Sequence, residues 1–210
     1  MDNQRTSIFV ACLLVGLSGC ASMNADECAA SDWSAIGYED GARGYTTEQF
    51  SGRRKACAKH GITADFQAYQ RGREQGLEAF CQPGRAFSFG ANGGRYNGVC
   101  AADMEPQFLD AYNAGHKLYR LRANVNSANS AIYSKEQELD YAENRITAVE
   151  LALISSDTTS EERIALLVEL KDLSERTGEL EVEIDMLIAD RARFEQDLQY
   201  YEQTVAAYGY

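Results

Sequence analysis

The sequence predicts an all-α protein: a small helical module stapled by disulfides, followed by a long antiparallel helical hairpin of the coiled-coil type. Three observations predict this class. Cysteines and glycines concentrate in the first half of the chain, and two heptad arrays of apolar residues fill the second half. A short polar run at residues 155–160 separates the two arrays. We therefore expect the module at residues 33–117 and the hairpin at residues 118–210.

Residues 1–19 have the layout of a secretory signal peptide. A short lead with Arg5 precedes about ten apolar residues, and small residues follow. The apolar run is too short to span a membrane, which takes roughly 20 residues. Leu17-Ser18-Gly19-Cys20 resembles the lipobox of bacterial lipoproteins. We expect cleavage before Cys20, attachment of several acyl chains there, and a polar tether over residues 20–32.

The residue after the cysteine and the charge distribution bear on location and partners. Ala21 rather than Asp follows Cys20. By resemblance to sorted lipoproteins of Gram-negative bacteria, this implies an outer-membrane protein that faces the periplasm. Residues 118–210 hold 9 basic and 19 acidic residues. This excess of acids repels nucleic acids and anionic lipids, so we expect the distal half to bind neither.

After Cys12 is lost with the signal and Cys20 takes lipid, four cysteines remain: Cys28, Cys57, Cys81 and Cys100. An even number in an oxidising compartment predicts two disulfides, and the absence of a C-x-x-C pair disfavours zinc. Helices expected near residues 34–45, 48–59 and 65–80 separate Cys57 from Cys81 by about 24 Å, too far to bridge. We favour Cys28–Cys57 with Cys81–Cys100; Cys28–Cys81 with Cys57–Cys100 comes second.

Glycines and aromatic residues mark two features of the module. A Tyr-x-x-Gly step occurs at Tyr38, Tyr69 and Tyr112, which we interpret as sites where helix backbones come close. The glycine-rich stretch between Cys81 and Cys100 predicts a surface loop with a small hairpin. Candidate contacts for a ligand on this loop are Phe87, Phe89 and Tyr96.

These residues resemble a family of bacterial envelope lipoproteins, the domain-of-unknown-function 2799 family. The likeness covers about residues 28–118. It rests on linked Trp, Gly, Tyr and Cys positions: Trp33, Gly37, Tyr38, Asp40, Gly41, Ala56, Cys57, Gly61, Tyr69, Gly72, Gly76, Leu77, Phe80, Cys81, Tyr96, Gly98, Cys100, Phe108, Tyr112 and Gly115. The resemblance implies a lipoprotein and supplies no activity, catalytic residue or cofactor.

The heptad arrays predict a hairpin about 65–70 Å long. Thr159 and Glu162 are spaced as a capping box for its second helix. A turn centred near Ser156 is the favoured register, because it places the polar seam residues Lys135 and Thr177 in one layer.

That favoured register also pairs Ala142 with Leu170. A turn centred near Ser160 is the alternative. It buries Lys135 against Ile184 and Arg191 against Ala128, at a cost for two charged side chains.

The sequence lacks the parts of a known enzyme. His60 and His116 are the only histidines, and neither has a metal-ligand partner four residues away. We expect no catalytic residue, cofactor or metal. The expected function is an outer-membrane-anchored scaffold, spacer or partner-docking arm that meets an envelope protein or a second copy of itself. The alternative is a glycan- or peptide-binding module that uses the Tyr/Gly region and the 81–100 loop.

Overall fold

The computed structural model describes residues 23–209, and this part of the chain contains helices and no strand. The helices, in order, are α1 (Ala25–Ala30), α2 (Trp33–Ala42), α3 (Glu48–Ala58), α4 (Phe66–Phe80), α5 (Pro83–Ala91), α6 (Glu105–Ile154) and α7 (Ser160–Ala207). The predicted all-α class is therefore confirmed. The predicted signal peptide and the lipidation site Cys20 lie outside the described residues. The chain divides into two compact units between Gly76 and Leu77.

The first unit contains a helix where the sequence predicted a tether. Asn24 and Glu27 form a capping box: the side chain of each accepts the backbone N–H of the other, at 2.9 and 2.8 Å. These reciprocal bonds satisfy amides that would otherwise have no partner, and they start α1. Cys28 on α1 is buried and bonded to Cys57 on α3. The prediction of a free tether is thus wrong for residues 25–30.

The next three helices match their predicted ranges because local signals set their ends. Asp32 caps α2 by accepting the N–H groups of Ser34 and Ala35 at 2.9 and 3.0 Å. Gly44 adopts a positive φ of 72° after α2, a conformation that favours glycine. Asp65 accepts the N–H of Ala68 at 2.9 Å at the start of α4.

The second unit contains α5, which replaces the predicted glycine-rich loop. Pro83 occupies the first turn of this helix, where a missing N–H costs nothing and the fixed φ suits the helix. Gly90 is buried within the same helix. The predicted surface hairpin is therefore wrong: Gly90 serves helix packing, which glycine content alone does not reveal.

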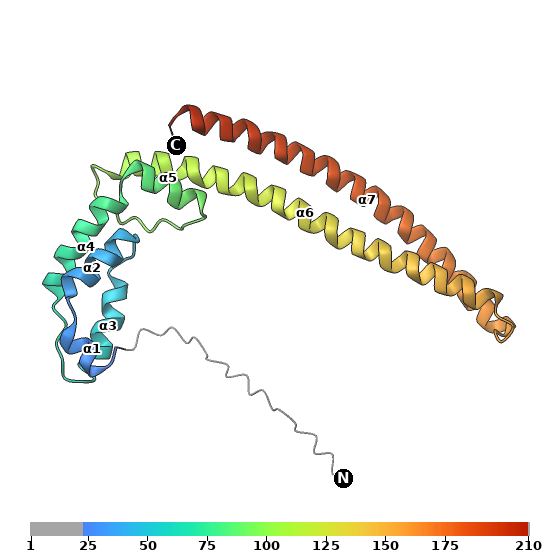
Figure 1. Cartoon of the computed structure of the whole chain (residues 1–210), viewed down its shortest axis with the longest axis horizontal. Helices are drawn as coiled ribbons and strands as arrows, with labels where there is room; N and C mark the ends of the chain where they lie inside the picture. The colour runs from blue at the N-terminus through green and yellow to red at the C-terminus, as the bar shows by residue number, and fades with distance from the viewer. Residues whose placement is uncertain (1–22, 210) are drawn as a thin grey trace, which may run out of the picture. The chain divides into compact units, whose positions relative to one another are not determined.

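Helices α6 and α7 form the predicted hairpin and lie side by side in opposite directions (Figure 1). The predicted capping box is present, since Thr159 and Glu162 bond reciprocally at the start of α7. Arg163 donates to the carbonyl oxygens of Leu153 and Ser155 and so caps the end of α6. Helix α6 continues without a break through residues 117 and 118, where the predicted domains were divided.

The polar contacts across the hairpin do not all fit one of the two predicted registers. Arg191 reaches Asn129 at 3.5 Å, and Asn129 is the neighbour of Ala128. Lys135 pairs at 2.9 Å with Glu183, the neighbour of Ile184. In the favoured register Arg191 and Asn129 would lie about 12 Å apart along the helix axis. Arg145 pairs with Glu169 at 2.6 Å and Arg176 with Glu138 at 3.0 Å, and both pairs lie closer to the favoured register. The register therefore stays a prediction.

The two predicted polar seam residues bond to other partners rather than to each other. Lys135 pairs with Glu138 and Glu183 at 3.3 and 2.9 Å, while the Thr177 hydroxyl donates to the carbonyl of Ser174 at 2.9 Å. Arg176, the neighbour of Thr177, pairs with the same two carboxylates, Glu138 and Glu183. The long stem of a lysine can cover apolar surface while its ammonium reaches carboxylates at the edge of the hairpin. The hydrogen bond to Glu183 raises the pKa of Lys135, which keeps it charged.

A crosslinking pair distinguishes the two registers. Ala142→Cys with Leu170→Cys is expected to form a disulfide readily, because the favoured register places these positions in one layer. Ala142→Cys with Thr177→Cys is the control and is expected to oxidise slowly. Gel mobility of tryptic fragments under non-reducing conditions measures both. Faster bridging of the Thr177→Cys pair would establish the register centred near Ser160.

Candidate functional site

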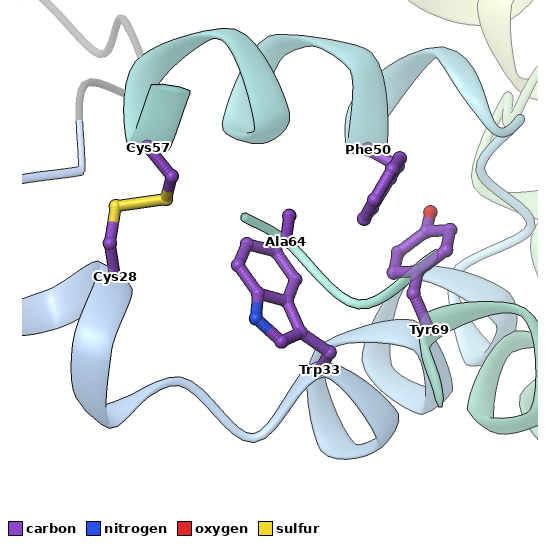
Figure 2. Close-up of a cluster of buried hydrophobic side chains, with 6 residues drawn as sticks. All are labelled: Cys28, Trp33, Phe50, Cys57, Ala64 and Tyr69. Atoms are coloured by element: carbon purple, nitrogen blue, oxygen red, sulfur yellow. A yellow bond between two sulfur atoms is a disulfide. The ribbon is translucent and has the colours of Figure 1, made fainter. Parts of the chain in front are cut away.

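The first cystine closes one end of a buried aromatic cluster. The members of the cluster are Cys28, Trp33, Phe50, Cys57, Ala64 and Tyr69. Figure 2 shows Trp33, Phe50 and Tyr69 pointing toward one another from separate helices, with the cystine beside them. The Phe50 ring lies 5.7 Å from Trp33, edge to face, and 4.7 Å from Tyr69. Such pairs add stability beyond the apolar area that they bury.

The first unit also buries a carboxylate. Asp40 is 2% exposed, and its Oδ2 accepts the Tyr69 hydroxyl at 3.0 Å. Arg53 donates to both carboxylate oxygens, with Nη2 at 3.0 Å from Oδ1. This hydrogen bond raises the pKa of Arg53. The arrangement satisfies a buried charge and joins α2, α3 and α4; no pattern in the sequence links Asp40 with Arg53.

Tyr69 should titrate well above the ordinary pKa of a tyrosine. Burial and the hydrogen bond to Asp40 raise its pKa to about 12 from an ordinary value of 10.0. The pKa of Tyr69 is higher in the folded protein than in the unfolded chain, so its protonated side chain contributes fully to folding stability below pH 10. That contribution is lost as the pH rises toward 12. Ultraviolet absorbance of tyrosinate during an alkaline titration measures this. Tyr69→Phe should remove the late component; a late component that survives would place it on another residue.

Glycines let the backbones of α2 and α4 touch. A Cβ on Gly37 would lie 2.0 Å from the carbonyl oxygen of Tyr69, and one on Gly72 would lie 1.8 Å from that of Ser34. Gly76 faces the carbonyl of Tyr38 in the same way, at 2.2 Å. The interpretation of the Tyr/Gly steps as close backbone contacts is confirmed here. At these three glycines the backbones of the two helices lie too close for a ligand to pass between them.

The second unit repeats this contact between α5 and α6. A Cβ on Gly90 would lie 2.3 Å from the carbonyl oxygen of Tyr112, and one on Gly115 would lie 2.0 Å from that of Phe87. Cys81 and Cys100 form the second disulfide, so the favoured cystine pairing is confirmed in full.

The spacing of the two contacts is the same. The first cysteine of each pair precedes its glycine by nine residues, at Cys28 and Gly37 and again at Cys81 and Gly90. The second cysteine precedes its tyrosine by twelve residues, at Cys57 and Tyr69 and again at Cys100 and Tyr112. A further glycine follows three residues later in each case. Only the segment between the cysteines differs, with separations of 29 and 19 residues.

The module is therefore one arrangement built twice, and the copies differ at the buried charge. The position of Asp40 in the first copy, three residues after Gly37, corresponds to Gly93 in the second. A Cβ on Gly93 would lie 2.7 Å from the ring of Tyr119, so an aromatic ring covers the space. The pattern was present in the sequence, but the unequal segments between the cysteines concealed it.

The three candidate ligand contacts lie together in the core of the second unit. Phe89 packs edge to face on Phe80 at 5.1 Å, and Tyr96 lies 4.6 Å from Phe108. The Tyr96 hydroxyl donates to Glu105 at 2.8 Å and accepts the N–H of Cys100 at 3.1 Å. Burial raises the pKa of Tyr96. Phe87 is half-buried against the same cluster, so the structural role of all three is packing.

The described part of the chain contains neither a cluster of metal ligands nor a membrane-spanning helix. Among residues 23–209, no group of three His, Cys, Asp or Glu side chains is placed to hold a metal ion. No helix in the same range is long and apolar enough to cross a membrane.

The comparisons with known proteins place the module in a family. Residues 32–117 match the model of a family described as "Protein of unknown function (DUF2799)". This range takes in most of both Gly/Tyr contacts and ends within α6. No curated protein and no solved structure gives a significant match.

Proposed function

We propose a non-enzymatic role as an anchored docking arm for this chain, whose residues 32–117 belong to the DUF2799 family of unknown function. The protein would be a lipoprotein of a bacterial outer membrane, held through Cys20. The doubled cystine module would be its base, and the α6–α7 hairpin would extend into the periplasm to meet an envelope partner.

Helix α6 is the observation that carries this proposal. Its start is buried in the second cystine cluster through Phe108 and Ala111, and the same helix continues to Ile154 in the hairpin. A helix of 50 residues is about 75 Å long. Because no joint interrupts it, the second unit holds the hairpin as a stiff arm rather than as a tethered domain.

The start of the first unit supports anchoring at Cys20. Met23 packs against the first cluster, with its sulfur 4.0 Å from that of Cys57. Met23 is the third residue after Cys20, a span of at most about 11 Å. A lipid on Cys20 would therefore hold the first cystine close to the bilayer surface. Several acyl chains on one cysteine make a stable anchor.

The anchor is tested by Cys20→Ala in the full-length gene. The unaltered protein is expected to incorporate labelled fatty acid and to sediment with outer membranes, and the variant to do neither. Cys12→Ala is the matched control, since that residue lies in the predicted signal, and it should leave both results unchanged. Fatty-acid labelling that persists in Cys20→Ala would overturn the anchor.

The arm is tested by photo-crosslinking in intact cells. A photoreactive residue at the exposed hairpin positions Tyr141 or Met186 is expected to capture an envelope protein. The same residue at Tyr38 or Tyr45, which are exposed on the module, is the control. Crosslinks at the module alone would assign binding to the module and reject the arm.

A further inference from the structure

The closed end of the hairpin carries a cluster of exposed aliphatic side chains. We call Leu151, Ile154, Ile164, Leu167 and Val168 the tip patch; they are 62%, 80%, 65%, 56% and 57% exposed. They come from the last turn of α6 and the first turns of α7, where the hairpin turns back (Figure 1). Farther along the hairpin, exposed apolar residues such as Tyr133 and Val182 are scattered. Clustered exposed apolar surface marks an interaction site more often than single residues do.

A groove lies at the same end. It has a volume of about 410 Å³ and is lined by Ala152, Asp157, Thr158, Glu162, Ala165 and Leu166. Its walls are mainly apolar, and two of its lining residues are carboxylates. The Glu162 carboxylate accepts the N–H of Thr159 in the capping box. Asp157 is exposed and accepts the Ser156 hydroxyl at 3.3 Å. The groove suits a side chain with an aliphatic stem and a positive end, which is the chemistry of lysine or arginine.

The charge around the tip limits the kind of partner that could bind there. Residues 147–168 contain four acidic residues and one basic residue, Arg163. The Arg163 guanidinium is already committed to the carbonyl oxygens at the end of α6. A second copy would bring an identical acidic tip, and an anionic bilayer would be repelled for the same reason. Only a basic apolar surface complements both features.

We infer that the hairpin tip is a docking site for a basic amphipathic helix of another envelope protein. The partner's apolar face covers the tip patch, and its lysines or arginines meet the acidic residues of the tip. This inference rests on the proposed docking-arm function and names the site and the partner chemistry for it. An amphipathic helix is the form of partner that lays an apolar face on such a patch.

Binding to a defined probe tests the chemistry. The probe is a fluorescent helical peptide of leucine and lysine, and a leucine–glutamate peptide of the same pattern is its counterpart. Both are titrated against the full mature chain carrying Cys20→Ala. The leucine–lysine peptide is expected to bind and the leucine–glutamate peptide is not. Equal binding of the two peptides overturns the inference, as does no binding of either.

Two matched triple variants test whether the probe binds at the tip patch. Leu151→Ser, Ile154→Ser and Leu167→Ser together should weaken probe binding about tenfold or more, since central apolar contacts carry most of an interface's affinity. Tyr133→Ser, Val182→Ser and Met186→Ser remove similarly exposed residues elsewhere on the hairpin and should leave affinity unchanged. Circular dichroism checks that both remain helical. Equal loss in the two variants overturns the tip site.

Photo-crosslinking at Ile154 in cells separates this inference from the arm function. The inference expects capture of a protein segment rich in lysine or arginine and in aliphatic residues. Capture of lipid, of an acidic segment or of a second copy of the chain overturns it. If Tyr141 and Met186 capture a partner while Ile154 captures nothing, the arm function stands and the tip site fails.

Discussion

Gly37→Ala is expected to destabilise the first unit by about 3 kcal/mol, an effect at the upper end for a single added methyl group. The new Cβ would lie 2.0 Å from the Tyr69 carbonyl oxygen and 2.9 Å from the Arg73 nitrogen, and both are backbone atoms. Backbone atoms of a helix cannot rotate away as a side chain can. Helices α2 and α4 must therefore separate, which also disturbs the ring contacts of Tyr69.

The matched control is Gly52→Ala in α3, where a Cβ meets nothing within 4 Å. This change should stabilise the protein by about 0.5–1 kcal/mol, because alanine loses less entropy than glycine on entering a helix. Denaturant unfolding measured by circular dichroism, with hydrogen exchange to localise the loss, gives both values. Equal effects at Gly37 and Gly52 would contradict the close backbone contact.

The doubled module extends this expectation to the second unit. Gly90→Ala should behave like Gly37→Ala, because its Cβ would lie 2.3 Å from the Tyr112 carbonyl oxygen. Gly84→Ala is the control in α5, since nothing lies within 4 Å of its Cβ. Hydrogen exchange should show the loss of protection in α5 and the start of α6. A small effect at Gly90 would mean that the two contacts are not energetically equivalent.

Removing a disulfide is expected to have the second large effect on folding stability. Replacing Cys28 and Cys57 by serine should cost about 3.6 kcal/mol, and replacing Cys81 and Cys100 about 3.2 kcal/mol, from the loop entropy that each bridge removes from the unfolded chain. The difference follows from the sequence separations of 29 and 19 residues. Both pairs are intrachain and hold core residues together, so their loss exposes the clusters around Trp33 and Phe108.

Thermal unfolding of the two double variants, each beside the oxidised parent, measures these costs. The single variant Cys12→Ser is a suitable control, because the predicted signal contains that residue and the mature protein should not change. The heptad contacts of α6 and α7 do not depend on either bridge, so helical signal from the hairpin should persist at temperatures that unfold the module. Loss of all helical signal in one step with the module would contradict that independence.

Local signals in the chain were sufficient for the class and for most helices. Asp32, Asp65 and the Thr159–Glu162 box set helix starts through bonds between neighbours in sequence, and such bonds can be recognised without a fold. Helix geometry also excluded a bridge between Cys57 and Cys81, and of the two cystine pairings that remained the favoured one is present.

The tertiary structure decided what depends on residues distant in sequence. The heptad pattern repeats every seven residues and so admits two registers one heptad apart, whereas edge contacts such as Lys135 with Glu183 arise only from how α6 and α7 pack. Asp40 meets Arg53 only because α2 and α3 pack together. The residues 83–91 form a helix because Gly90 can touch α6. The sequence by itself determined which elements form and where they are capped; the packing of one element on another determined edge contacts, buried charge and the use of each glycine, since those free energies arise only between elements.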